Sequence, residues 1–133
     1  SNTFTGKGYI NTAELTDTLP VSLGADNSIT VKRDRRTDFT SQKLIGSNRI
    51  ETRSFLISVR NNKNRDVTVK LRDQLPMPQN SNITVEAVEL SGGKHDNATG
   101  EVIWDLTVAP RETREIIFTY SVKYPKNKRV VLE

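Results

Sequence analysis

Apolar and polar residues alternate one by one along much of this sequence, and nowhere is a helical repeat of apolar residues sustained. The alternation is clearest in residues 29–32, 54–60, 67–72, 102–108 and 116–122. Because successive side chains of a β-strand point to opposite faces, each of these segments would present one apolar and one polar face. An antiparallel sheet with one solvated side requires that pattern, so the sequence predicts an all-β protein.

Turn-forming residues separate the alternating segments. Glycine, asparagine and proline gather at residues 24–27, 46–48, 61–64, 92–100 and 109–112. We expect the asparagines of 61–64 to adopt the positive φ angles of a tight turn, and 109–112 to close a hairpin. Turns at intervals of roughly 8–12 residues are typical of sandwiches. The predicted fold is therefore an immunoglobulin-like antiparallel β-sandwich with Greek-key connections and about seven to nine strands.

Two local irregularities refine this prediction. The apolar phase slips by one residue at Ala87 and Val88, and a β-bulge there would restore the correct facing. The segment 75–78 contains two prolines, which lack ladder donors and so exclude a central strand. We expect this segment to carry the chain from one sheet to the other.

The chain has the length of one domain. Its 133 residues are only 34% apolar, but the apolar residues are concentrated in the alternating segments, so a core forms without disulfides. We predict a single domain over residues 1–133, with edge strands in 1–24, core strands in 25–124 and a C-terminal tail in 125–133. The predicted core consists of Ile29, Val31, Phe55, Ile57, Val59, Val67, Val69, Leu71, Trp104, Leu106, Phe118 and Tyr120.

Composition excludes several classes of protein. The absence of cysteine excludes disulfides, thiolate nucleophiles and cysteine metal sites. No stretch reaches the roughly 18 apolar residues of a membrane helix, and no signal peptide is visible, so we expect no membrane insertion. We expect a domain excised from a longer protein whose targeting signal lies upstream. The formal net charge is +4, with acidic and basic residues interspersed as on a well-solvated surface.

The sequence offers few groups for catalysis. Its single histidine, His95, lies beside Asp96 in the polar loop 92–100, and we interpret it as a solvated surface residue. Serine hydrolases also need a nucleophile motif and an oxyanion hole, and the sequence has neither Gly-x-Ser-x-Gly nor a phosphate-binding loop. We therefore predict a protein that is not an enzyme, with no catalytic residues, metal ligands or cofactors.

Acidic residues form the other clusters that could carry chemistry. Asp96, Glu101 and Asp105 are expected around one hairpin, but the regular ligand spacing of a calcium loop is missing. Glu86 and Glu89 flank the suspected bulge. Paired carboxylates can hydrolyse glycosides, but strand-borne acids on a polar face are ordinary, so we interpret both sets as solvated.

Asp73 ends an alternating segment just before the chain leaves its sheet. We favour a structural role over a ligand role, with its carboxylate accepting backbone N–H bonds and fixing the corner. The residues that bind any ligand stay open at this point. So does the role of two Asn-x-Thr triplets, at 82–84 and 97–99.

Basic residues gather at residues 32–36, 63–65 and 126–129. Nucleic-acid binders interleave such charges with exposed aromatic residues. Four aromatic residues fall on the apolar phases of strands and therefore in the core: Phe55, Trp104, Phe118 and Tyr120. Three others are expected at the surface without forming a series: Tyr9, Phe39 and Tyr124. We therefore expect no nucleic-acid partner, and charges that guard sheet edges against aggregation.

The order of segments from residue 49 onward resembles a recurrent bacterial immunoglobulin-like pattern. The matching residues are Val59, Asn61, Val67, Val69, Asp73, Leu75, Pro76, Trp104, Ala109, Pro110 and Glu112.

Nearly the whole chain resembles the C-terminal domain of the mucoidy inhibitor A-like proteins, a family of uncharacterised activity. The resemblance rests on FTGKGYI (residues 4–10), LPVSLGADNSITVKR (19–33), VTVKLRDQLP (67–76) and FTYSVKYPKNK (118–128). One departure is Asn127, where the family often has glycine, and asparagine tolerates the same left-handed turn. The resemblance implies an upstream helical or coiled-coil region and export to the envelope in many bacterial members. It implies no catalytic residues.

The expected function is that of a non-catalytic structural or protein-interaction module at the C-terminus of a larger bacterial, envelope-associated protein. Its expected partner is another protein or the upstream region of the same polypeptide, its expected location is the periplasm or cell envelope, and its oligomeric state stays open. The alternative is a carbohydrate- or cell-surface-binding module that uses the loop 92–100. Sugar rings stack on exposed aromatic residues, and this loop contains none, which favours the first function.

Overall fold

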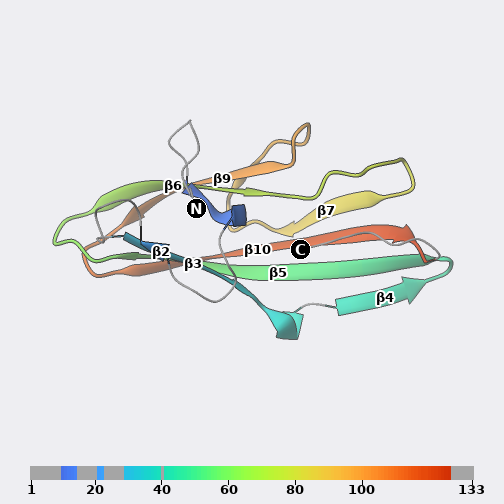
Figure 1. Ribbon diagram of the computed structural model, residues 1–133, viewed down its shortest axis with the longest axis horizontal. Coiled ribbons are helices and arrows are strands. Elements are labelled where there is room, and N and C mark those ends of the chain that lie inside the picture. The colour runs from blue at the N-terminus through green and yellow to red at the C-terminus, as the bar shows by residue number, and fades with distance from the viewer. Residues whose placement is uncertain (1–9, 15–20, 23–28, 40, 127–133) are drawn as a thin grey trace.

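Ten strands and two short 3₁₀ helices occupy the residues that the computed structural model describes, which are 10–14, 21–22, 29–39 and 41–126 (Figure 1). The strands are β1 (Ile10–Asn11), β2 (Val21–Ser22), β3 (Ile29–Arg35), β4 (Ser41–Ile45), β5 (Asn48–Asn61), β6 (Val67–Gln74), β7 (Thr84–Glu89), β8 (Lys94–His95), β9 (Glu101–Val108) and β10 (Thr113–Pro125). The helices are η1 (Thr12–Glu14) and η2 (Thr37–Phe39). The all-β prediction is confirmed. The strands outnumber the expectation because β1, β2 and β8 have only two residues each, too few to show an alternation.

The strands form two sheets that share one core. The four-stranded sheet has the order β1-β6-β9-β8. The six-stranded sheet has the order β2-β3-β5-β10-β7, and β4 also pairs with β5. Strands β3 and β4 lie one after the other along the same edge of β5, because β3 pairs with residues 55–61 and β4 with residues 48–52. The predicted β-sandwich is therefore confirmed.

Two crossings between the sheets lie side by side at one end of the sandwich. The chain passes from β5 to β6 and, later, from β9 to β10, while β5 pairs with β10 and β6 pairs with β9. The turn 109–112 is therefore a crossing between sheets, and the expected hairpin is wrong. A tight turn is needed in either case, so turn residues alone do not distinguish them. The segment 75–78 does connect the two sheets, as predicted.

Asn61 stabilises the first crossing through its side-chain amide. Its Nδ2 donates to the backbone oxygens of Arg65 (2.7 Å) and Val108 (2.9 Å), and its Oδ1 accepts from the Lys63 N–H (2.8 Å). None of the residues 61–64 has a positive φ, so the expected left-handed turn is wrong. The Asn61 amide therefore joins the end of β5 to the end of β9, and both its nitrogen and its oxygen are hydrogen-bonded, as a buried amide requires. The predicted turn 24–27 lies outside the described residues.

The core agrees with the alternating phases. All of the predicted core residues are buried except Val67, which is half-buried and packs against the others. Phe118 lies at the centre of an aromatic cluster, with its ring centroid 6.2 Å from Phe55, 5.7 Å from Trp104 and 5.6 Å from Tyr120. Tyr124 was expected at the surface but is buried, since it continues the inward phase of β10.

The predicted bulge is present in β7. Glu89 pairs with Thr119 and Ala87 with Tyr120, so Val88 is an extra residue without a partner in β10. The bulge keeps both Val85 and Leu90 packed against the core on either side of it. Val88 itself is 58% exposed, so the expectation that the bulge turns this residue inward is wrong.

Candidate functional site

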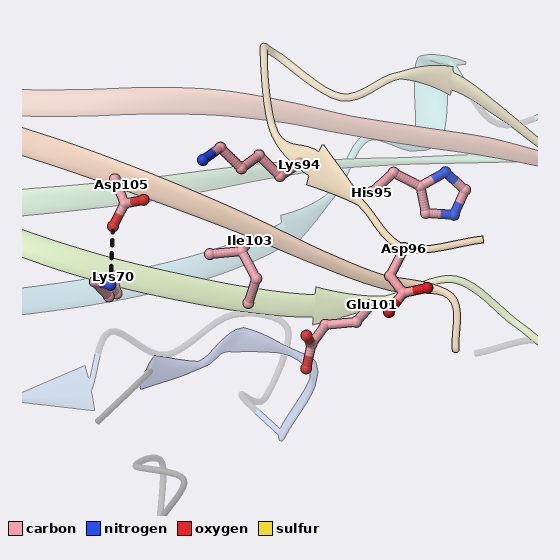
Figure 2. Close-up of a pocket in the computed structure, with 7 residues that line it drawn as sticks. All are labelled: Lys70, Lys94, His95, Asp96, Glu101, Ile103 and Asp105. Atoms are coloured by element: carbon pink, nitrogen blue, oxygen red, sulfur yellow. Dashed lines mark ion pairs between the residues drawn. The ribbon is translucent and has the colours of Figure 1, made fainter. Parts of the chain in front are cut away.

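A hollow of about 290 Å³ lies on the outer face of the four-stranded sheet, the face away from the core (Figure 2). Strand β9 contributes Ile103 and Asp105, and β6 contributes Lys70. Strand β8 and the following loop supply the other side of the hollow. The remaining lining residues are Lys94, His95, Asp96 and Glu101. The structure thus brings together His95 and the three acids that the sequence places around one hairpin.

Each acid of the hollow already has a partner. Asp96 Oδ1 accepts a hydrogen bond from the Ala98 N–H at 2.9 Å, which closes a local turn. Glu101 Oε2 lies 2.6 Å from Arg72 Nε. Asp105 Oδ1 lies 3.8 Å from Lys70 Nζ, between side chains that are half exposed. The hollow is therefore a surface of locally paired charges.

The chemistry of the hollow is limited by what surrounds it. Among the described residues, no three histidines, cysteines or acids are grouped so that they could hold a metal ion. Within that same part of the chain, Phe39 is the one strongly exposed aromatic side chain, and it belongs to η2, far from the hollow in sequence. A stacking platform for a sugar ring is therefore not found here. Glu86 and Glu89 lie on β7, away from the hollow.

Asp73 belongs to a buried ion pair between the two sheets. Its carboxylate accepts from Arg33 Nε at 3.0 Å, from Thr12 Oγ1 at 2.7 Å and from the Gln74 N–H at 2.7 Å. Arg33 and Asp73 are 1% and 0% exposed, and the Arg33 guanidinium lies 3.9 Å from the centre of the Phe55 ring. The predicted backbone bond to the corner is thus present. The interpretation of Arg33 as one of a surface cluster of basic residues is wrong, because it lies on the inward phase of β3.

A charged face continues the core towards the other end of the six-stranded sheet. Beyond Phe55, the inward positions of β5 carry Arg53, Glu51 and Arg49, which pair across the sheet with β10. Arg35, the last residue of β3, pairs with Phe55 and lies beside them. We call Arg35, Arg49 and Arg53 the arginine face.

The arginine face is half-buried and poor in acceptors. The Nε atoms of Arg35, Arg49 and Arg53 are buried, and each has no hydrogen-bond acceptor among the residues that the structure describes. Glu51 is the one carboxylate between them, 3.7 Å from Arg53 Nη2. Its Oε1 already accepts from the Tyr124 hydroxyl (2.8 Å) and Gln42 Nε2 (2.6 Å). Burial, together with Glu51, raises the pKa of Tyr124 against the opposing hydrogen bond and charge of Arg49, so this hydroxyl stays protonated at neutral pH and donates to Glu51.

An exposed apolar edge adjoins the arginine face. Every residue of β4 is exposed, and Leu44 and Ile45 are 61% and 56% exposed. Phe39, just before β4, is 58% exposed with the Arg36 guanidinium 3.7 Å from its ring centre. We call Phe39 and β4 the β4 edge. One side of β4 pairs with β5, and nothing in the described part of the chain pairs with the other side. Figure 1 shows β4 beyond the end of β6 and β9 along the long axis.

The opposite edge of the same sheet is built differently. Strand β7 carries the bulge at Val88 and the charged residues Glu86 and Glu89. Bulges and charges are the devices by which proteins prevent an edge from pairing with another chain. The β4 edge has neither a bulge nor acidic residues, and Lys43 is its one charged side chain in β4.

These features define the chain as a two-sheet β-sandwich domain with an extended, partly uncovered six-stranded sheet. The chain belongs to the family described as a domain of unknown function (DUF4139), whose model matches residues 2–126. No curated protein and no solved structure matches the chain. No helix among the described residues is both long and apolar enough to span a membrane. The immunoglobulin-like and mucoidy inhibitor A-like resemblances stay predictions.

The arginine face and the β4 edge were both missed in the sequence. The charged residues of 49–53 hold the same phase as Phe55, so a face that turns from apolar to arginine-rich was readable from the alternation. The segment 41–45 carries two adjacent apolar residues, Leu44 and Ile45, and shows no alternation that would have indicated a strand. Its strand structure comes from pairing with β5 through the turn at Gly46 and Ser47.

Proposed function

We propose that this domain is a non-catalytic protein-interaction module that captures an extended segment of a partner by adding a strand beside β4. The observation that carries the proposal is the concentration of exposed apolar side chains on an edge strand that has no second partner among the described residues. In that part of the chain, five large apolar side chains are strongly exposed, and three of them, Phe39, Leu44 and Ile45, belong to the β4 edge. An uncapped apolar edge is the template on which proteins bind extended peptides.

Strand addition supplies both kinds of contact that binding needs. The free edge of β4 offers backbone N–H and C=O groups, which give affinity for any extended chain. Leu44 and Ile45 point to opposite faces of the sheet, so an added strand meets an apolar side chain on each face. A second copy of β4 is a poor occupant. The antiparallel register that pairs all of β4 with its copy is centred on Lys43 and places two lysines opposite each other.

The proposed setting follows the resemblance to the mucoidy inhibitor A-like proteins. The domain would lie at the C-terminus of a larger bacterial protein of the periplasm or envelope. The captured segment would come from another envelope protein or from the upstream region of the same polypeptide. The absence of an aromatic platform at the hollow in Figure 2 supports this function over sugar binding.

The test is selection of binding peptides followed by variants of the two sheet edges. Random peptides are selected on the intact chain, and their Kd is measured for the double variant Leu44→Ser with Ile45→Ser. We expect its affinity to fall about tenfold or more, because two apolar contacts are lost. Thermal unfolding should be nearly unchanged, since both side chains are mostly exposed.

The matched control is Val88→Ser on the bulged edge, where the wild-type side chain is as exposed as Phe39. This variant should bind the selected peptides like wild type. Equal loss in both variants, equal binding by all three proteins, or failure to select any peptide would each overturn strand addition at the β4 edge.

A further inference from the structure

The arginine face holds more cationic groups than its carboxylates can satisfy. In the described part of the chain, the buried Nε donors of Arg35, Arg49 and Arg53 have no acceptor, and the Glu51 carboxylate is shared with Gln42 and Tyr124. Buried donors are almost always hydrogen-bonded, and an unsatisfied one is destabilising. Nearby Arg33 shows the satisfied arrangement, with its guanidinium on the Asp73 carboxylate. The arginine face therefore has too few negatively charged oxygen atoms to accept the hydrogen bonds that its guanidinium groups can donate.

We propose that the arginine face is a carboxylate-binding site for an acidic, extended segment of a partner polypeptide. A guanidinium presents its N–H groups as a fork that matches a carboxylate, so each arginine can take one acid in a bidentate contact. Such a contact supplies acceptors to the guanidinium groups of these half-buried side chains, which have too few acceptors in the described part of the chain. The site is independent of strand addition at the β4 edge, because it uses side chains of the inward face of β3 and β5.

The placement of the arginines sets the spacing of the acids. Arg49 and Arg53 are four residues apart on one face of β5, which separates their Cα atoms by about 14 Å in a strand. An extended segment with acidic residues four positions apart spans the same distance. Arg35 adjoins the Arg53 end, because its pair Phe55 lies two residues from Arg53. The favoured ligand thus has separated acids, one for each end of the face.

A nucleic acid fits this face less well. Glu51 lies between Arg49 and Arg53, where it would repel a continuous line of phosphates more strongly than two carboxylates that are set apart from it. Bases also need exposed aromatic rings on which to stack, and the Phe55 ring is fully buried beneath Arg33. Both the position of Glu51 and the burial of the Phe55 ring therefore favour an acidic polypeptide over a nucleic acid as the ligand.

The test is a titration of the intact chain with a repeat peptide, Glu-Gly-Ser-Gly, followed by NMR of the arginine Nε–H groups. The peptide should shift the Nε–H signals of Arg35, Arg49 and Arg53, and binding should weaken as salt is added. The same repeat with glutamine in place of glutamate should give no shifts. Signals that stay in place with the acidic peptide, or that move equally with the glutamine peptide, would overturn the site.

Variants check the site by a second route. Arg53→Gln and Arg49→Gln should each weaken binding about tenfold, since each removes a charge-assisted contact. Arg60→Gln is the matched control, because Arg60 is exposed on the opposite face of β5, and its affinity should equal that of wild type. If either arginine variant unfolds, the changes in the Nε–H signals of the wild-type chain alone decide whether the site exists. Tighter binding of inorganic polyphosphate than of the acidic peptide, with shifts at the same three arginines, would overturn the carboxylate assignment.

Discussion

Replacing Asp73 by alanine is expected to lower the free energy of unfolding by about 3–5 kcal/mol, the usual loss when one partner of a buried ion pair is removed. The variant would leave the Arg33 guanidinium, 1% exposed, without its carboxylate. It would also remove the acceptor of the Gln74 N–H and one of the two acceptors of the Thr12 hydroxyl, the other being the Arg72 backbone oxygen. The measurement is urea denaturation at neutral pH. The Phe55 ring beside Arg33 does not replace the lost carboxylate, because a ring face is a much weaker partner than a charge.

Two further variants distinguish the buried pair from charge effects in general. Asp105→Ala breaks the half-exposed contact with Lys70 and should cost only about 0–1 kcal/mol. The double variant Arg33→Met with Asp73→Leu should recover much of the loss, because it removes the unpaired charge along with its partner. Equal, small losses for Asp73→Ala and Asp105→Ala would contradict the buried pair. So would a double variant less stable than Asp73→Ala.

Replacing Phe118 by alanine is expected to cost about 3–5 kcal/mol, in the range found for buried phenylalanines. Phe118 is fully buried and contacts rings from both sheets, Phe55 on β5 and Trp104 on β9. Its removal opens a cavity at the centre of the core that no neighbour can fill without moving a strand. The measurement is again urea denaturation, with Trp104 fluorescence as the probe.

The control for this prediction is Phe39→Ala on the β4 edge. Its ring is 58% exposed, so its loss should change stability by only about 0.5 kcal/mol or less. A loss of stability at Phe39 comparable with that at Phe118 would contradict the placement of both rings.

The alternation of side chains was enough to predict the sheets and most of the core. The phase of the alternation decides which face of a strand is buried. The burial of Phe118 and Trp104 and the bulge at Val88 could therefore be predicted from the sequence. The same phases also marked Arg33 and Asp73, which end two alternating runs on the apolar side. Their partnership was not readable, because it depends on β3 and β6 belonging to facing sheets.

Connections between strands were less predictable than the strands. The residues 109–112 suit a tight turn whether the chain returns to its own sheet or crosses to the other. The difference is decided by pairing distant in sequence, β5 with β10 and β6 with β9. Tyr124 shows a different error, since it was expected at the surface although it continues the inward phase of β10.

The candidate site was the least predictable part for a physical reason. Its defining property is that β4 and the end of β5 that pairs with it extend beyond the four-stranded sheet (Figure 1). The arginines of β5 at this end are only half-buried, and β4 is exposed. Relative strand lengths and the stagger of two sheets are tertiary properties. The acids and His95 at residues 95–105 were grouped correctly from the sequence, but their mutual pairing depends on β6, which contributes Lys70 and Arg72.

The most direct test of the central claim is a structure of the domain bound to one of the selected peptides. Strand addition predicts an extended peptide beside β4, hydrogen-bonded to the backbone of residues 41–45 and in contact with Leu44 and Ile45. The six-stranded sheet would then contain one strand more. A peptide bound in the hollow of Figure 2, or elsewhere with the free side of β4 still open, would contradict the account.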